Sequence, residues 1–263
     1  MAMTPERVQD AADLLYDAWT RGEVIDALPG PVRPATREEG YAIQARLEAR
    51  SAKPLYGWKI AATGKAGQQH INVDGPLAGR LLAERVVDSG GSVPESPNRM
   101  RVAEVEFAFR MGRDLAPRDV PFTVDEVLGA VATLHSAIEI PDSRYEDFTT
   151  VGAPQLIADD ACAHYFVCAE STGADWRALD LVAHRVLGRV EGRYEREGSG
   201  AAVLGDPRVA LAWLANELRA LGITLSRGQT VTTGTCFKPL ELEPGDVVVA
   251  DLGVIGRASV RFA

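Results

Sequence analysis

The sequence predicts an α+β fold with a mainly β core. Short runs of alternating apolar and polar residues, bounded by Gly and Pro turns, dominate the second two-thirds of the 263-residue chain. Helical patterns occur singly between these runs and twice near the N-terminus. The hydrophobic content of 46% supports a sizeable core, and the length fits one large domain, with or without a small N-terminal appendage.

Two helices are expected in the N-terminal region. The first begins at Thr4-Pro5, an N-cap residue followed by proline in the first turn, and ends at Gly22. A Pro-rich link over residues 28–34 leads to the sequence TREE at 36–39, a capping-box pattern that begins a second helix reaching about Arg50. We interpret these helices as a small cap over the rest of the chain.

The middle of the chain alternates strand and helix patterns. Alternating residues or short apolar runs predict strands, and capping or helical spacing predicts the helices between them. The expected strands cover residues 55–62, 80–87, 101–111, 135–141 and 164–169; a polar loop covers 68–80, a helix follows the capping box at 123–126, and a short helix covers 153–160.

The last third is expected to contain two hairpins around one strong helix. Glycines at 188 and 192 divide a strand pair over residues 181–195. Apolar residues at helical spacing run from Asp206-Pro207 to Gly222. A strand over 231–235 follows, and a turn at 244–246 leads into a final hairpin that ends near Phe262.

The composition limits the possible partners and compartment. With 28 Lys and Arg against 37 Asp and Glu, the net charge of −9 argues against nucleic acid or an anionic membrane as partner. Three cysteines without a C-x-x-C pair fit a reducing compartment. No apolar run approaches the roughly 18 residues of a membrane span, and no signal peptide is visible, so we expect a cytoplasmic protein.

The strand at 101–111 carries the first candidate site residues. Alternation places Glu104 and Glu106 on one face, with Cα atoms roughly 6.5 Å apart. Two unpaired carboxylates side by side repel each other, and a hard divalent cation would relieve that repulsion. The alternative is the solvated outer face of an antiparallel sheet. A third acid, Glu139, favours the metal because a carboxylate within an apolar segment needs a partner.

Lys59 is the candidate cation. In the strand at 55–62 it projects from a face of small residues, including Gly57 and Ala61, which leaves room for a ligand beside it. The alternative is a surface lysine whose alkyl stem covers apolar surface. Arg144, by contrast, is interpreted as the ion-pair partner of a neighbouring acid.

These residues belong to a wider pattern. The motif E-x-E is followed after about thirty residues by A-x-E-I-x-D-S-R, and other segments match as well: GWKIAATG at 57–64, VDGPLAG at 73–79, TTG at 232–234 and residues 242–262. Over nearly the whole chain the sequence resembles the fumarylacetoacetate hydrolase superfamily. Within it, the sequence is most similar to the 2-keto-4-pentenoate (2-hydroxypentadienoate) hydratases and the related 4-oxalocrotonate decarboxylases.

The resemblance implies a fold and a site. The fold would be a mixed β-roll with an N-terminal helical cap, the cap and first strand region covering residues 1–84 and the catalytic β-roll 85–263. In the implied site, Mg²⁺ or Mn²⁺ is bound by Glu104, Glu106 and Glu139. The implied catalytic residues are Lys59 and Asp74. The implied substrate-binding residues are Asp160, Thr233 and Gly234.

The chain departs from the hydratase pattern at two positions. Gly75 stands where that pattern usually has Glu, which leaves the role of Asp74 open, and Asp160 stands where it usually has Asn. The added charge of Asp160 near the expected pocket predicts a preference for substrates with one carboxylate over substrates with two.

The implied function is that of a metal-dependent hydratase that adds water to a 2-hydroxy-2,4-dienoate or 2-keto-enoate in the catabolism of aromatic compounds. Two alternatives use the same three acids: decarboxylation of a 4-oxalocrotonate-type acid and hydrolysis of an acylpyruvate C–C bond. Two others are a metal-free binding or structural protein that has kept the fold, and an accessory subunit that acts with a homologous decarboxylase or hydratase. A homo-oligomer is expected.

Overall fold

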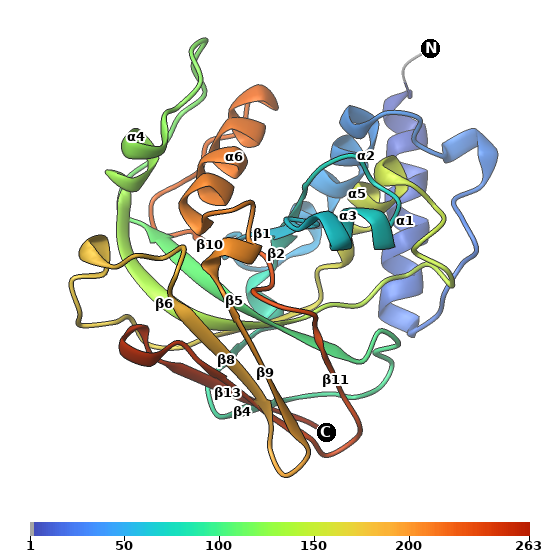
Figure 1. Cartoon of the computed structure of the whole chain (residues 1–263). Coiled ribbons are helices and arrows are strands. Elements are labelled where there is room, and N and C mark those ends of the chain that lie inside the picture. The colour runs from blue at the N-terminus through green and yellow to red at the C-terminus, as the bar shows by residue number, and fades with distance from the viewer. Residues whose placement is uncertain (1–2) are drawn as a thin grey trace.

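The computed structural model describes residues 3–263 and confirms the α+β class (Figure 1). The α-helices are α1 (Pro5–Arg21), α2 (Arg37–Gln44), α3 (Lys65–His70), α4 (Val124–Leu128), α5 (Ala153–Ala158) and α6 (Pro207–Ala220). The strands are β1 (Gly57–Ala61), β2 (Leu77–Leu81), β3 (Val86–Asp88), β4 (Gly91–Val93), β5 (Val102–Met111), β6 (Val131–Ile140), β7 (Tyr165–Cys168), β8 (Arg185–Val190), β9 (Tyr194–Ser199), β10 (Thr230–Thr232), β11 (Leu240–Glu241), β12 (Val247–Asp251) and β13 (Arg257–Phe262).

Within residues 3–263 the strands form two sheets. The eight-stranded sheet has the order β2-β1-β10-β5-β6-β7-β3, and β11 pairs with β5 outside this path. It is mixed, since β1 and β10 are parallel whereas β5 and β6 are antiparallel. The five-stranded sheet has the order β4-β13-β12-β8-β9. In Figure 1 the smaller sheet lies below the larger one, with α1, α2 and α5 gathered to one side and α6 and α4 to the other.

The first N-terminal helix forms as expected, and the second is shorter. The hydroxyl of Thr4 accepts a hydrogen bond from the backbone of Arg7, and Gly22 ends α1 with a φ of 67°. The expected helix to Arg50 ends instead at Gln44 and continues as a 3₁₀ segment. The TREE segment forms half a capping box, because the carboxylate of Glu39 accepts from other backbone N–H groups.

Two further expectations need correction. The strand expected over 80–87 is two strands, β2 and β3, which a 3₁₀ turn over Ala83–Arg85 separates and which pair with different partners. The loop expected over 68–80 contains the second half of α3 and most of β2. The hairpin expected over 181–195 is confirmed but lies later, as β8 and β9, with Gly192 at a φ of 72° in its turn. The C-terminal hairpin and α6 are confirmed.

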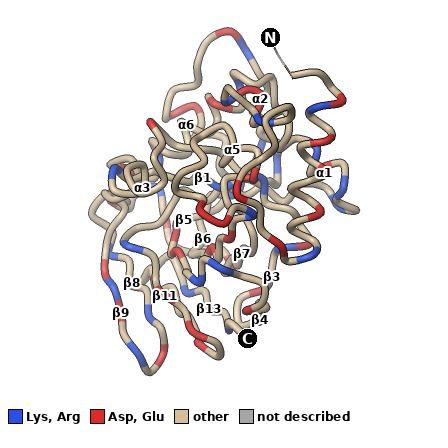
Figure 2. The backbone as a smooth tube through the Cα atoms, turned by 90° about the vertical axis from the view of Figure 1, so that its right-hand side faces the viewer, with Lys and Arg blue, Asp and Glu red and all other residues tan. Residues whose placement is uncertain are grey.

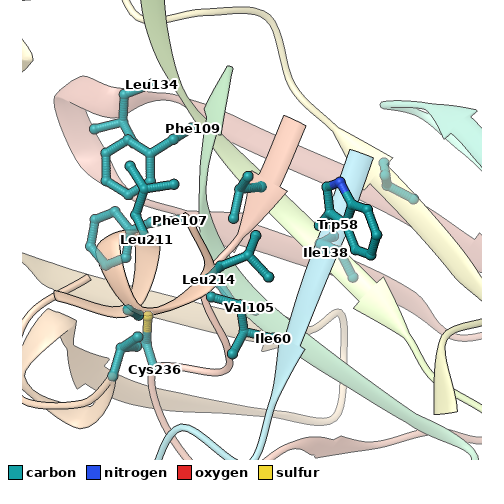
Figure 3. Packing of buried hydrophobic residues seen from close by; sticks show 14 of the residues in the cluster. Trp58, Ile60, Val105, Phe107, Phe109, Leu134, Ile138, Leu211, Leu214 and Cys236 are labelled. Atoms are coloured by element: carbon teal, nitrogen blue, oxygen red, sulfur yellow. The ribbon is translucent and has the colours of Figure 1, made fainter. Parts of the chain in front are cut away.

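The main core fills the space between α6 and the two sheets. The apolar face of β5 contributes Phe107 and Phe109, both fully buried. Figure 3 shows Leu211 of α6 beside these rings and Leu214 nearer to Val105 of the same strand, and the spacing of three residues puts the two leucines on one face of the helix. Fully burying one such side chain stabilises the fold by roughly 1.5–3 kcal/mol. This packing fixes β5, and therefore the acids on its other face.

The N-terminal helices rest on the segment that follows β6. A second apolar cluster joins α1 and α2 to Tyr145 and Ala158. The boundary expected at residue 84 falls between β2 and β3, which belong to the same sheet. The division into 1–84 and 85–263 stays a prediction.

Charged residues of both signs are interspersed over the described surface. Figure 2 shows Lys and Arg close to Asp and Glu along α1 and along β8 and β9. The pair Arg185–Glu197, 2.7 Å apart, links those two strands across exposed surface. No helix within residues 3–263 combines the length and the apolar composition that crossing a bilayer requires.

Candidate active site

The register of two antiparallel strands brings three acidic residues together. Glu104 of β5 lies opposite Glu139 of β6, and Glu106 follows two residues later on the same face of β5. The three residues can present carboxylate oxygens that all lie within 4.8 Å of one another. Glu106 and Glu139 are 0% exposed. The alternative of a solvated sheet face is therefore wrong.

These carboxylates lack the partners that buried charges need. Oε1 of Glu106 and Oε2 of Glu139 receive no hydrogen bond from the described residues, and Oε1 of Glu139 has only the ammonium group of Lys59, 2.9 Å away. Burial raises the pKa of all three acids, to about 7 for Glu139; for Glu106, burial together with the charges of Glu139 and Glu104 raises the pKa well above its ordinary value. Three ionised carboxylates here require more positive charge than one lysine supplies.

The donor set fits a hard divalent cation. Carboxylate oxygens are the ligands that Mg²⁺ and Mn²⁺ prefer, and an ion with about six ligands would keep roughly three positions for water or substrate. Glu106 is held in place by its Oε2, which accepts hydrogen bonds from the Gly234 N–H at 2.8 Å and from the Thr232 hydroxyl. Its Oε1 stays free to act as a ligand.

Lys59 extends from β1 into the same cluster. Its Nζ lies 2.9 Å from Oε1 of Glu139 and donates a hydrogen bond of 2.9 Å to the carbonyl of Ala161. The residue is 2% exposed, so the surface-lysine alternative is wrong. Burial alone would lower the pKa of Lys59, but the charges of Glu139 and Glu104 outweigh burial and raise it. The ammonium group therefore keeps its charge.

Two glycines make this arrangement possible. Gly79 pairs with Lys59 across β1 and β2, and a Cβ there would lie 2.9 Å from Cδ of the lysine and 2.4 Å from the carbonyl oxygen of Asp160. Gly234 has a φ of +95°, and a Cβ there would lie 2.1 Å from Oγ1 of Thr63. Gly79, on the neighbouring strand, thus leaves space for the Lys59 side chain, and it could not be identified from the sequence.

A left-handed turn carries the carbonyl that Lys59 binds. Asp160, Ala161 and Cys162 have φ values of 55°, 51° and 62°. For residues other than glycine this backbone costs roughly 1–2 kcal/mol each, and strain of this kind concentrates at functional sites. A buried ion pair between Arg144 and Asp159 holds the start of the turn, which confirms the structural interpretation of Arg144.

Asp74 and Thr233 are not brought to the acids. The side chain of Asp74 is 90% exposed and lies 3.4 Å from the guanidinium of Arg37. The hydroxyl of Thr233 donates to the backbone carbonyl of Phe107 at 3.2 Å. Its neighbour Thr232, which the sequence analysis passed over, is the residue that binds Glu106. The TTG segment could have identified Thr232, because strand alternation puts Thr232 and Thr233 on opposite faces, so that only one of them can face the acids.

Asp160 is the first residue of this left-handed turn and is fully buried. Its Oδ1 accepts a hydrogen bond of 2.6 Å from the backbone N–H of Arg80, whereas its Oδ2 has no partner among residues 3–263. Burial raises the pKa of this carboxyl to about 7. Its neighbours Ala161 and Cys162 reach the cavity beside Lys59. The role of Asp160 in substrate binding stays a prediction.

Replacing Asp160 with Asn should stabilise the metal-free protein, and more so as pH rises from about 4 to 7. The pKa of this carboxyl is 3.8 in an ordinary environment and about 7 in the fold, so the folded state holds the proton more tightly. The contribution of Asp160 to the free energy of unfolding of the wild type is therefore fully present below the ordinary pKa. As pH rises from the ordinary pKa to the folded-state pKa, this contribution falls by up to about 1.4 kcal/mol per pH unit. Asn cannot titrate, and it tolerates a left-handed backbone.

Urea unfolding at pH 5 and pH 7.5 would measure this effect. The exposed Asp119→Asn serves as the control and should change stability equally little at both pH values. A difference between Asp160→Asn and wild type that is the same at both pH values would contradict the expectation.

A cavity of about 880 Å³ opens beside the acids and the lysine. Lys59, Glu104 and Gly234 form part of its wall. Most of the remaining wall is apolar and includes Ile71, Leu77, Met100, Phe148, Leu156 and Phe237. The cavity can therefore seat a small organic acid with its polar end at the carboxylate cluster.

Comparison with curated proteins gives full-length relatives, although no protein-family model matches the chain. The chain is 31% identical to a 2-keto-4-pentenoate hydratase of Paraburkholderia xenovorans (strain LB400), over 99% of this chain and 96% of that protein. It is 29% identical to a 2-hydroxyhexa-2,4-dienoate hydratase of Comamonas testosteroni, over 97% of each. It is 30% identical to a 2-oxo-hept-4-ene-1,7-dioate hydratase of Escherichia coli, over 95% of this chain and 96% of that protein.

Solved structures of related enzymes have a similar fold. A 4-oxalocrotonate decarboxylase from Pseudomonas putida G7, complexed with magnesium and adipate, superposes with a TM-score of 0.89 at 25% identity and covers 100% of this chain and 99% of that one. A fumarylacetoacetate hydrolase from Exiguobacterium antarcticum has a TM-score of 0.56 at 15% identity, over 80% of this chain and 75% of that one, and shares the fold.

Proposed function

Because the chain belongs to the 2-keto-4-pentenoate hydratase family of the fumarylacetoacetate hydrolase superfamily, we propose that it is a divalent-metal-dependent hydro-lyase. Its substrate would be a 2-hydroxy-2,4-dienoate or 2-keto-enoate from the breakdown of aromatic or related compounds. The observation that carries the proposal is the cluster of three acids, two of them fully buried, with Lys59 beside one cavity, in a chain with full-length relatives named as hydratases. The metal-free binding protein is the weaker alternative, because without a metal Oε1 of Glu106 and Oε2 of Glu139 would be buried with no partner among the described residues.

Glu104, Glu106 and Glu139 would hold Mg²⁺ or Mn²⁺. Such an ion, when bound, supplies Lewis-acid stabilisation of negative charge that develops on the 2-oxo oxygen of the substrate. Thr232 and the N–H of Gly234 keep Glu106 oriented for this task. The apolar wall limits the water near the reacting atoms, which strengthens every electrostatic interaction there.

Lys59 would serve as the catalytic cation. Since Glu139 and Glu104 keep it protonated, it can stabilise substrate charge or donate a proton from Nζ. In the net reaction the enol proton of the dienoate moves to C5, and water then adds across C3 and C4, with its hydroxyl on C4 and its proton on C3. Asp74 stays a candidate base that would need the segment around α3 to move towards the acids.

The hydratase is expected to convert 2-hydroxypenta-2,4-dienoate to a 4-hydroxy-2-oxo acid in the presence of Mg²⁺ or Mn²⁺, without release of CO₂. Decarboxylation is the second candidate, because the fold matches a 4-oxalocrotonate decarboxylase over its full length. The test compares the dienoate with a six-carbon dicarboxylate analogue and measures both the hydrated product and CO₂. Release of CO₂ from the dicarboxylate at a higher kcat/KM than hydration of the dienoate would select decarboxylation.

We also propose a cytoplasmic homo-oligomer, which can associate with a homologous decarboxylase or hydratase. The cysteine usage supports the compartment. Light scattering of the purified chain, alone and mixed with such a partner, tests both forms of assembly.

A further inference from the structure

The cavity is much larger than the simplest substrate requires. Its volume of about 880 Å³ lies in the upper part of the roughly 300–1,000 Å³ range of pockets that enclose drug-sized ligands. A five-carbon dienoate is far smaller than such a ligand. The remaining volume can therefore hold a longer substituent on the distal carbon of the substrate.

Strand β5 shows one direction in which that substituent can lie. Glu104 and Val102 are on the same face, about 7 Å apart by strand rise, and both are half-buried in the cavity wall. Met100, just before the strand, is also in the wall. From the acid cluster the strand thus leads outward along apolar side chains. Phe148 adds a further apolar surface, with its ring 6.0 Å from that of His70 of α3.

The charges around the cavity do not suit a second carboxylate. Arg99 is already occupied by both carboxylate oxygens of Glu146, at 2.7 Å. Lys238 lies 2.8 Å from Glu241, which itself pairs with Val102 across β11 and β5 and lines the cavity. A distal carboxylate near Val102 would therefore meet Glu241, and the cations beside it, Lys238 and Arg196 at 3.6 Å, already pair with that acid. Lys65 is also in the wall, but it is exposed to solvent. An ion pair between an exposed lysine and a substrate carboxylate would add little to the binding free energy.

We propose that this site selects a 2-hydroxydienoate with one carboxylate and an uncharged apolar substituent longer than methyl on C5. The substituent packs along Val102 and Met100. This inference rests on the proposed hydratase function and names the substrate class of the same site. The preference for one carboxylate thus has a cause in the apolar wall and in Glu241, separate from the charge of Asp160.

The first test measures kcat/KM of the purified enzyme with Mg²⁺ for three dienoates: unsubstituted, with a propyl group on C5, and with a carboxymethyl group on C5. A buried methylene is worth roughly fourfold in binding, so the propyl compound should exceed the other two by at least about tenfold. If the unsubstituted dienoate is hydrated but the carboxymethyl compound is the best substrate, or the propyl compound is no better than the unsubstituted one, the inference fails and the hydratase function stands. If none of the three is hydrated, the proposed function fails and the inference with it.

The second test places the substituent in the cavity. Val102→Trp fills the wall next to Glu104, so the ratio of kcat/KM for the propyl compound to that for the unsubstituted one should fall at least tenfold. The ratio is taken within one preparation and does not depend on the fraction of folded enzyme. Val254→Trp, at a position that is 62% exposed and outside this cavity, should keep the wild-type ratio. An unchanged ratio in Val102→Trp would overturn the inferred position of the substituent.

Discussion

Glu106→Gln is expected to weaken Mg²⁺ binding by on the order of 100-fold and to reduce turnover at least as much. The reason is that the NH₂ of the amide takes the place of the free Oε1 of Glu106, and an NH₂ group is a poor metal ligand. The substitution keeps the shape of the side chain. The amide oxygen can still accept from Gly234 and Thr232, so its orientation is preserved. Titration calorimetry with Mg²⁺ and Mn²⁺ measures the affinity.

The folding of this variant should be unimpaired. In the metal-free protein, burial and the nearby acids make the Glu106 carboxylate costly to ionise, and an amide removes that cost. Thermal unfolding without metal should therefore give a Tm equal to or above that of wild type. The exposed Glu191→Gln is the matched control and should change neither metal affinity nor turnover. Unchanged metal binding in the Gln variants of Glu104, Glu106 and Glu139 alike would show that the metal site is misplaced.

The acid cluster could be predicted because strand alternation depends only on local sequence. Glu104 and Glu106 share a face in any strand that contains both, and the apolar neighbours of Glu139 signal burial. The register that sets Glu104 opposite Glu139 is a long-range fact that only the resemblance implied. Lys59 was predicted on a face of small residues, yet the carbonyl of Ala161 that it binds comes from a turn about 100 residues later, with a backbone that no propensity favours.

The parts of the fold that were misjudged depend on tertiary pairing. Residues 80–87 look like one strand in sequence, but β2 and β3 lie at opposite edges of the large sheet, and the chain must turn between them. Asp74 lies in the segment 73–79, which matches the resemblance, but its position is set by the loop that carries it, and Arg37 on α2 forms an exposed ion pair with it. Side chains whose positions depend on such loops cannot be placed from local sequence.

Lys59→Met is expected to lower kcat by at least tenfold, about 1.4 kcal/mol of activation free energy, and to leave Mg²⁺ affinity unchanged or higher. The reduced turnover follows from the loss of the charge that would stabilise the substrate or donate a proton. The unchanged or tighter metal binding follows from electrostatics, because the Lys59 ammonium group lies 2.9 Å from Glu139 and competes with a divalent cation for the same carboxylate.

The two variants thus separate two roles in one cluster. Glu106→Gln should lose turnover together with metal affinity, whereas Lys59→Met should lose turnover alone. Calorimetry and initial rates on the same preparations, with saturating Mg²⁺ in the rate assay, make the comparison direct. Lys53→Met, at an exposed position, should behave as wild type in both measurements. Turnover of Lys59→Met within twofold of wild type would mean that this buried lysine serves only to balance the charge of Glu139 in the metal-free protein, and the catalytic role would then have to belong to another residue of the cavity.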